Sequence, residues 1–174
     1  MADINKLYSD VNNILKGINV KKIDPNKDDF QSLPTGYYLC SFKLAVTTSN
    51  AGNLQVKSEM KVVEPGLAVD AEGDFVEIKG TLNRKMWKYY SLKDEESVTK
   101  LIKDMLKFED EDGESLLVEE DFASMEQIEA ACEVVEDMQL YVNVNTYTKD
   151  GETKSFINVL SWKRAEELGL LGDE

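Results

Sequence analysis

The sequence has no histidine and only two cysteines, Cys40 and Cys132, among its 174 residues. Without histidine, Ser-His-Asp catalysis, Cys-His catalysis and zinc sites that use imidazole are excluded, and two cysteines do not complete a tetrahedral zinc site. No apolar run reaches the roughly 18–20 residues that a membrane-spanning helix needs. The first ten residues carry acids and amides where a secretory signal has a basic and then an apolar segment. The sequence therefore predicts a cytoplasmic protein, without membrane contact, whose cysteines are reduced and buried.

Basic residues are scarce in one internal segment, and this explains the formal net charge of −14. Residues 94–137 contain 17 acids and 3 bases, which alone amount to −14, whereas the rest of the chain is neutral. Hydrophobic residues make up 42% of the chain, which is enough to build a core. We therefore expect an acidic insertion, residues 94–137, within a charge-balanced folded domain.

The N-terminal segment has the periodicity of an amphipathic helix. Apolar residues recur every three or four positions over residues 4–15, with Asp3 as a candidate N-cap and Gly17 as a candidate end. Residues 18–32 lose this period and contain Asp24-Pro25, which is typical of a linker. The predicted parts are a helix and linker at residues 1–29, a main domain at residues 30–163 and a short acidic tail at residues 164–174, where a short helix is expected.

Five segments of the main domain have the composition of β-strands, namely residues 37–47, 54–63, 75–87, 140–147 and 155–162. The third is expected to place Val76, Ile78, Gly80 and Leu82 on one face. A glycine-containing connection joins the first two strands. Asp150-Gly151 joins the last two and is a strong hairpin signal.

Two helices are expected within the acidic insertion. The first begins near Asp94 and carries an apolar stripe from Val98 to Leu106, and the second follows a capping box at residues 124–127. Three strands, a helical insertion and a final hairpin follow the order of an oligonucleotide/oligosaccharide-binding (OB) barrel. The predicted fold is mainly β with inserted helices (α+β), a five-stranded antiparallel OB-like barrel preceded by a helix. A generic α+β sandwich fits the same order less specifically.

The densest candidate site lies at the end of the third strand. Four cations and three aromatic residues fall between residues 83 and 93, and they are Arg84, Lys85, Trp87, Lys88, Tyr89, Tyr90 and Lys93. Lysine and arginine neutralise phosphates, and aromatic rings accept stacked bases. Alternation places Lys85, Trp87 and Tyr89 on one face and Arg84, Lys88 and Tyr90 on the other. The pattern favours nucleic-acid binding, although a strand end capped by aromatics and solvated by lysines has the same composition.

Further candidates lie on the other predicted strands. Lys57 and Lys61 would lie about 5 Å from neighbouring strands that carry Lys43 and Lys79, in a row suited to a phosphate backbone. Glu59 and Glu77 interleave with these lysines and could pair with them instead.

The last predicted hairpin adds Tyr141, Tyr147, Lys149 and Lys154. Its tyrosines, on the outward face, either stack bases or pack under the N-terminal helix.

No metal, cofactor or catalytic residue is expected. Asp110, Asp112 and Glu119 match ligand positions of a calcium-binding loop, but Phe108 stands at the first position and offers no oxygen. Glu64 with Glu77-Ile78-Lys79 is a weak match to a magnesium-dependent nuclease. The sequence contains no Gly-x-x-x-x-Gly-Lys phosphate loop.

Four parts of the sequence carry a resemblance: residues 33–38 (LPTGYY) with the strand after them, residues 47–54 (TTSNAGNL), Gly80-Thr81-Leu82 followed by Trp87 and a helix, and residues 140–158 with their Asp-Gly turn. Over roughly residues 30–162 the chain resembles a family of phage-encoded proteins found beside recombination and replication genes and thought to bind single-stranded DNA. The long acidic insertion is atypical of that family. Its members usually carry lysine in the first hairpin, where this chain has Ser49, Asn50 and Ala51.

The resemblance implies an OB-like barrel that coats single-stranded DNA in the cytoplasm of an infected bacterium, without sequence preference or catalysis. Together with the residue patterns it predicts contacts at Lys43, Lys57, Lys61, Lys79, Arg84, Lys85, Trp87, Lys88, Tyr89, Tyr90, Tyr141, Tyr147, Lys149 and Lys154. Host or phage proteins are further candidate partners for the acidic insertion or the tail. The N-terminal helix is a candidate surface for self-association.

The alternative is a phage inhibitor that imitates the charge of DNA. In that interpretation the acidic insertion occupies the basic channel of a host nuclease or defence complex. The residues expected to make this contact are Glu109, Asp110, Glu111, Asp112 and Glu114.

Overall fold

The computed structural model describes residues 4–22 and 33–171, in two compact units that divide between residues 31 and 32. The first unit contains α1 (Ile4–Gly17) and a short 3-10 helix, η1 (Val20–Lys22). α1 confirms the helix predicted over residues 4–15, and none of its residues is buried. The candidate cap Asp3 and most of the predicted linker lie outside the described residues.

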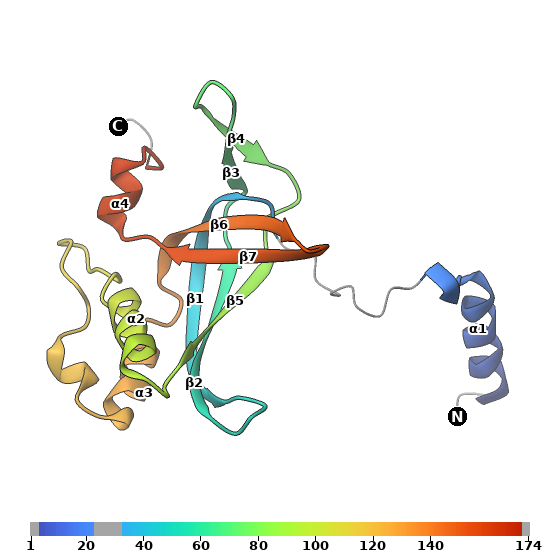
Figure 1. Ribbon diagram of the computed structural model, residues 1–174, viewed down its shortest axis with the longest axis horizontal. Helices are drawn as coiled ribbons and strands as arrows, with labels where there is room; N and C mark the ends of the chain where they lie inside the picture. Colours follow the sequence, from blue (N-terminus) through green and yellow to red (C-terminus); the bar gives the residue numbers. More distant parts are fainter. Residues whose placement is uncertain (1–3, 23–32, 172–174) are drawn as a thin grey trace. The chain divides into compact units, whose positions relative to one another are not determined.

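The second unit is an α+β domain on one antiparallel sheet of seven strands. Its elements, in order, are β1 (Gly36–Thr48), β2 (Leu54–Val62), β3 (Gly66–Val69), β4 (Phe75–Ile78), β5 (Lys85–Ser91), α2 (Glu95–Met105), η2 (Glu119–Phe122), α3 (Met125–Val134), β6 (Gln139–Lys149), β7 (Glu152–Val159) and α4 (Trp162–Glu167). β1 is central, because it pairs with β2, β3 and β6 (Figure 1). The strand order is β4-β3-β1-β2-β5, and the β6–β7 hairpin joins it at β1.

The sheet does not close on itself. β5 pairs only with β2 and β7 only with β6, so no ladder joins β5 to β7 in the part of the chain that the structure describes. The predicted closed five-stranded barrel is therefore not confirmed. The α+β class, the N-terminal helix and the helical insertion between β5 and β6 are confirmed.

The third predicted strand, residues 75–87, is wrong as a single strand. It is divided into β4 and β5 by a turn in which Gly80 and Asn83 have positive φ angles of 76° and 67°. The face expected for this strand does not form, since Val76 is 47% and Leu82 is 48% exposed.

A buried hydroxyl explains this break. Thr81 Oγ1 accepts a hydrogen bond from the backbone N–H of Gly66 at 2.8 Å and donates one to the carbonyl of Ile78 at 2.8 Å. Gly66 begins β3, a short strand that the sequence pattern did not predict. The turn is thus fixed by a contact across fifteen positions of the chain, which alternation within one segment does not reveal.

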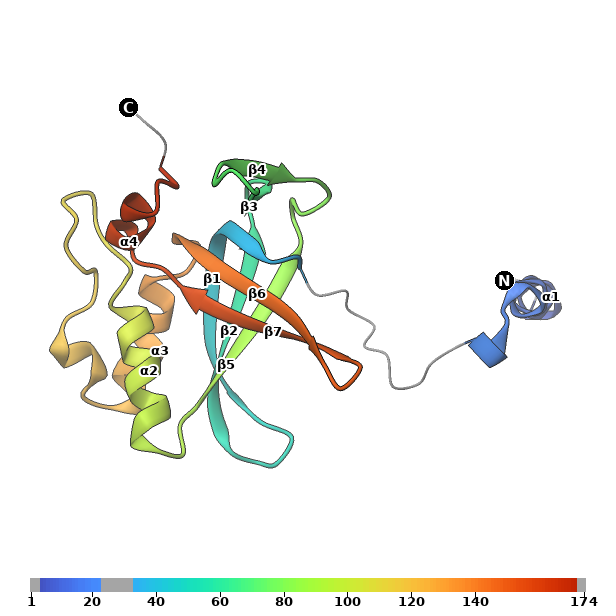
Figure 2. The same ribbon diagram turned by 45° about the horizontal axis from the view of Figure 1, so that its top comes forward.

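Even-numbered residues of β1, β2, β5 and β6 form the core, together with the odd-numbered Ile157 and Val159 of β7. Met60 of β2 lies opposite both Phe42 of β1 and Met86 of β5, and all three are buried. α2 packs against β5 and adds Leu101 and Met105, while α3 packs against β1 (Figures 1 and 2). Since burying one such side chain contributes roughly 1.5–3 kcal/mol, this arrangement fixes the even-numbered face inward. The odd-numbered face of β2, β5 and the second half of β1 is left toward solvent, whereas Tyr37 and Leu39 of β1 pack in a second cluster with Tyr141.

Polar caps begin the helices at the predicted places. The Asp94 carboxylate accepts a hydrogen bond from the backbone N–H of Ser97 at 2.7 Å, and this bond lowers the pKa of Asp94. Ser124 Oγ accepts one from the backbone N–H of Gln127 at 3.3 Å. Each satisfies an N–H group that has no partner within its own helix. Ser161 caps α4 in the same way and confirms a short helix near the C-terminus.

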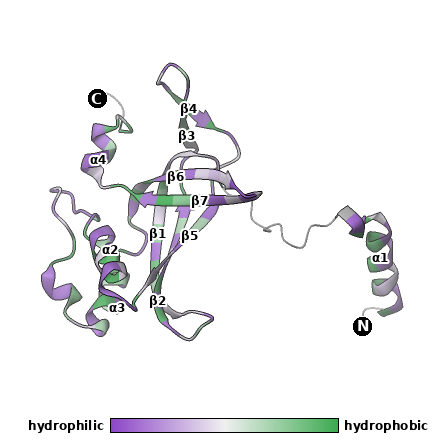
Figure 3. Ribbon diagram, in the orientation of Figure 1, coloured by the Kyte–Doolittle hydropathy of each residue, from purple (hydrophilic) through white to green (hydrophobic). Residues whose placement is uncertain are grey.

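Hydrophilic residues dominate the segment between α2 and α3, as the purple colouring in Figure 3 shows. The helices differ from this segment in having one apolar side. Within residues 4–22 and 33–171, no helix is both long enough and apolar enough to cross a membrane.

Candidate nucleic-acid interface

The outer face of β1, β2 and β5 gathers six of the predicted site residues. They are Lys43, Lys57, Lys61, Lys85, Trp87 and Tyr89. Directly opposite residues of an antiparallel pair project from the same side of the sheet. Lys57 lies opposite Tyr89, Lys61 lies opposite Lys85, and Glu59 lies between Lys43 and Trp87. Cations from three strands therefore share one surface with two aromatic rings, which we call the outer face.

Contacts on the outer face leave most of its charge available. Lys85 Nζ lies 3.3 Å from the Glu59 carboxylate, and Lys57 Nζ lies 5.9 Å from the centre of the Trp87 ring. Glu59 is the only acid among the described residues that project from this face. Tyr89 is 54% exposed, so its ring is accessible for stacking. Glu59 thus pairs with Lys85 and not with the lysines considered for it in the sequence, and it neutralises only one of the four lysines of this face.

Tyr90 and Lys88 do not belong to this face, and their predicted roles need correction. Tyr90 is buried, and its hydroxyl donates a hydrogen bond to the Asp104 carboxylate of α2. Burial, followed by the negative charge of Asp104 and this hydrogen bond, raises the pKa of Tyr90. Lys88 Nζ lies 3.4 Å from Asp104 and donates to the carbonyl of Ile157 at 3.0 Å. Their even positions on β5 turn both side chains toward the core and α2, so Tyr90 has no ring surface for a base.

The predicted contact of Tyr141 with a base also needs correction, because this side chain is buried. Its ring packs edge-on against Trp162 of α4, with ring centres 5.9 Å apart, and its hydroxyl donates to the carbonyl of Leu170. Burial is the main cause that raises the pKa of Tyr141, and the charge of Glu64 adds to it. The sequence left open whether this ring stacks bases or packs under the N-terminal helix, and in the structure Trp162 of α4 packs against it.

The other predicted residues are placed away from the outer face. Tyr147 lies opposite Lys154, and Lys149 opposite Glu152, on the β6–β7 hairpin. Tyr147, Lys149 and Lys154 are exposed, and Tyr147 is 47% exposed.

Two predicted cations flank the turn between β4 and β5. Lys79 follows β4, at the opposite end of the strand order from β5. Arg84 is half-buried next to β5, and its carbonyl accepts a hydrogen bond from the N–H of Val62. The row expected to include Lys79 is therefore not formed.

A groove of about 560 Å³ lies between β5, α2 and β7. Trp87 and Tyr89 line it from β5, Lys100 and Lys103 line it from α2, and Phe156 lines it from β7. In the sequence these α2 lysines stand out only as the few bases of an acidic insertion, and no pattern marks Phe156. Their spacing on one helix face was a signal for a basic stripe, but only the fold shows what this stripe faces.

One carboxylate organises the turn in each of two acidic loops. Asp110 accepts hydrogen bonds from the backbone N–H groups of Asp112 at 2.8 Å and Glu114 at 3.0 Å. Asp70, Glu72 and Asp74 form a similar turn, in which carboxylate oxygens lie within 4.8 Å of one another. These hydrogen bonds hold the backbone of both loops in a turn.

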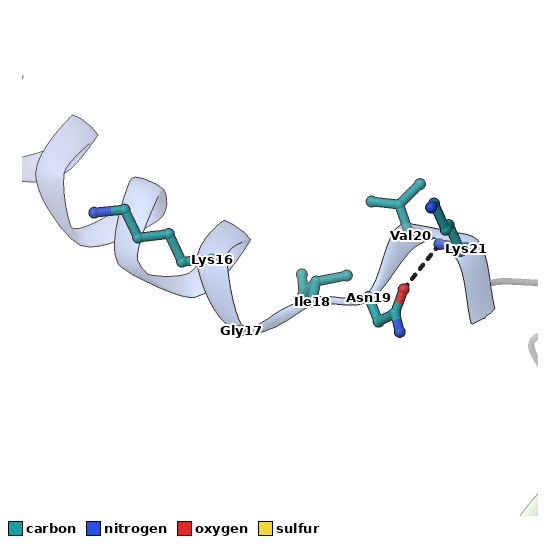
Figure 4. A pocket seen from close by; sticks show the side chains of 6 residues that line it. All are labelled: Lys16, Gly17, Ile18, Asn19, Val20 and Lys21. Carbon is teal, nitrogen blue, oxygen red and sulfur yellow. Dashed lines mark hydrogen bonds between the residues drawn. The ribbon is translucent and has the colours of Figure 1, made fainter.

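A hollow near the end of α1 is formed by six consecutive residues of the first unit, from Lys16 to Lys21 (Figure 4). Its one internal hydrogen bond runs from the N–H of Lys21 to the Asn19 side chain. The side chains of Lys16 and Val20 point in different directions, so the hollow lacks convergent groups for a ligand.

The outer face and the groove place cations beside accessible aromatic rings, which is the combination of groups that suits phosphates and unpaired bases. Models of known protein families and curated protein sequences give no match to this chain. Its function is therefore inferred from the geometry of these two surfaces.

Proposed function

We propose that this protein binds single-stranded DNA, without sequence preference and without catalysis, through the outer face of β1, β2 and β5. The observation that carries the proposal is the register that aligns Lys57 with Tyr89 and Lys61 with Lys85 beside Trp87. Rings stack on unpaired bases, and lysines neutralise the adjoining phosphates. A duplex hides the faces of its bases, so this combination favours single strands. Every base has a face that can stack, so little sequence preference is expected.

The order of the long strands supports the same proposal. β5-β2-β1-β6-β7 is the order of an OB barrel that is opened between its third and fifth strands. OB folds bind oligonucleotides on their second and third strands, which correspond here to β2 and β5. The resemblance to phage-encoded proteins of replication and recombination adds a biological setting to this proposal, the bacterial cytoplasm.

Binding of a fluorescent oligo-dT, followed by anisotropy at two or more salt concentrations, tests the proposal. We expect binding that weakens steeply with salt. Replacing Tyr89 by alanine should weaken it about 5- to 150-fold, since stacking contributes about 1–3 kcal/mol per base. Tyr89→Phe keeps the ring and should bind as the unchanged protein does.

Tyr8→Ala is the matched control, because Tyr8 is an exposed tyrosine of the first unit. Absence of binding at micromolar protein in low salt would refute the proposal. So would equal effects of the Tyr8 and Tyr89 substitutions.

A second candidate, the charge-mimicking inhibitor, is favoured by the many acids of the insertion that form no ion pair. Residues 108–148 contain no lysine or arginine, and in the described structure none of the acids at positions 109–137 forms an ion pair. The two candidates respond differently when the five acids within residues 109–114 are replaced by their amides. Inhibition of a DNA-cleaving enzyme should then disappear if the protein is an inhibitor, whereas DNA binding should be kept or strengthened if it binds DNA.

A further inference from the structure

We propose that the groove between β5, α2 and β7 continues the DNA-binding surface, and that Lys100 and Lys103 hold phosphates of a strand that leaves the outer face across β5. The inference rests on the proposed function and assigns a second part to its binding site. It gives the acidic insertion a direct role in binding the strand.

The three bases of the acidic insertion lie on one side of α2 and of the turn that follows it. Lys100, Lys103 and Lys107 are spaced by three and four positions, so they share one helix face, and all three line the groove. Asp104 is the only acid that lines it. An insertion of net charge −14 thus turns its only cations toward the aromatic residues of β5.

Two of the groove's lysines hold the fold together. Lys107 Nζ lies 2.7 Å from the Asp104 carboxylate and donates to the carbonyl of Val159 at 2.7 Å. Lys88 makes the corresponding bonds to Asp104 and to the carbonyl of Ile157. Carbonyls of alternate residues on a strand point to the same edge, so the two ammonium groups cap the unpaired edge of β7. These lysines form the floor of the groove, and they connect β5 and α2 to β7 where no strand ladder does.

The other two lysines remain available for a ligand. Lys103 is exposed and forms no ion pair with another described residue. Lys100 Nζ lies 3.4 Å from Glu96, but the two side chains are 69% and 81% exposed. An exposed pair of this kind is worth about 0–1 kcal/mol, so a phosphate can replace Glu96 at little cost.

The groove is continuous with the outer face and has an aromatic wall on its far side. Trp87 and Tyr89 belong to both surfaces. Phe156 of β7 lines the opposite wall and is 60% exposed, which offers a second stacking surface. Phe156 and Lys154 lie on the same face of β7, because side chains alternate along a strand. A single-stranded DNA that follows the groove past Phe156 therefore approaches the exposed pair Lys154 and Tyr147.

Oligo-dT strands of increasing length, titrated at several salt concentrations, test the inference. Each phosphate contact contributes about 0.7 to the slope of log K against log salt for single strands. Replacing Lys100 and Lys103 by glutamine should lower this slope by about 1.4 on long strands and leave the shortest strands that bind unaffected. Phe156→Ala should weaken only the longer strands.

Lys79→Gln is the control, because Lys79 is also an exposed lysine without an ion pair to a described residue, but it follows β4. It should not change the slope. A groove variant with the slope of the unchanged protein at every length would overturn the inference and leave the proposed function standing. The inference would also be overturned if the slope fell equally for oligonucleotides of every length, or if Lys79→Gln lowered it by the same amount. If the unchanged protein binds no oligonucleotide, the inference and the proposed function both fail.

Discussion

Asp104 holds α2 to the sheet, and replacing it gives a quantitative test of how this domain is closed. Its carboxylate accepts hydrogen bonds from the Tyr90 hydroxyl and from the ammonium groups of Lys88 and Lys107, and only 14% of its side chain is exposed. Removing one partner of a buried ion pair costs about 3–5 kcal/mol. The two lysines are 29% and 20% exposed, so water partly compensates for the loss. We therefore expect Asp104→Ala to lower the free energy of unfolding by about 3 kcal/mol and Asp104→Asn by about 2 kcal/mol.

Urea unfolding followed by circular dichroism measures this change. With a denaturant slope of about 2 kcal/mol per molar, the midpoint for Asp104→Asn should fall by about 1 M. Glu167→Gln is the matched control, since its pair with Arg164 spans 3.2 Å but is about half exposed at both ends (50% and 58%). This control should change stability by less than about 0.5 kcal/mol. If Asp104→Asn shifts the midpoint no more than Glu167→Gln does, the hydrogen-bonded cluster does not close the domain.

Two further predictions concern buried polar groups. Burial raises the pKa of the Cys40 thiol from 9.0 to about 12, so the folded state keeps a proton that the unfolded state loses above about pH 9. Stability should therefore fall above that pH, by about 1.4 kcal/mol per pH unit for this group, and urea midpoints at pH 8 and pH 10 should differ less in Cys40→Ala. Replacing Thr81 by valine leaves the N–H of Gly66 and the carbonyl of Ile78 without their partner, and should lower stability by about 2 kcal/mol. Thr81→Ser keeps the hydroxyl and should restore most of this loss in the same assay; equal losses in both variants would argue against the hydrogen bonds as the cause.

Local signals predicted most of the elements. The periods of the N-terminal helix and of β2, the cap at Asp94 and the hairpin signal Asp150-Gly151 all mark features that form between neighbours in the chain. The break between β4 and β5 was missed because Thr81 acts on Gly66, fifteen positions away. β3 was missed for the same reason, since its four residues become a strand only by pairing with β4 and with β1.

The predicted site was found in part. Alternation correctly grouped Lys85, Trp87 and Tyr89, because side-chain direction along one strand follows from position alone. It could not tell that the alternate face of β5, with Tyr90, turns onto Asp104 of a helix. The burial of Tyr141 could not be predicted for a similar reason, since α4 covers this ring only after the chain has folded back on itself.

The sequence by itself determined most of the helices and long strands, and where the negative charge concentrates. These properties depend on residues a few positions apart, whose interactions survive in any arrangement of the elements. The tertiary structure alone decided that the sheet stays open between β5 and β7 and that three lysines of an acidic insertion face Trp87 and Tyr89. These outcomes depend on contacts between α2, β5 and β7, which are separated by up to about seventy positions and meet only when the core between them is packed.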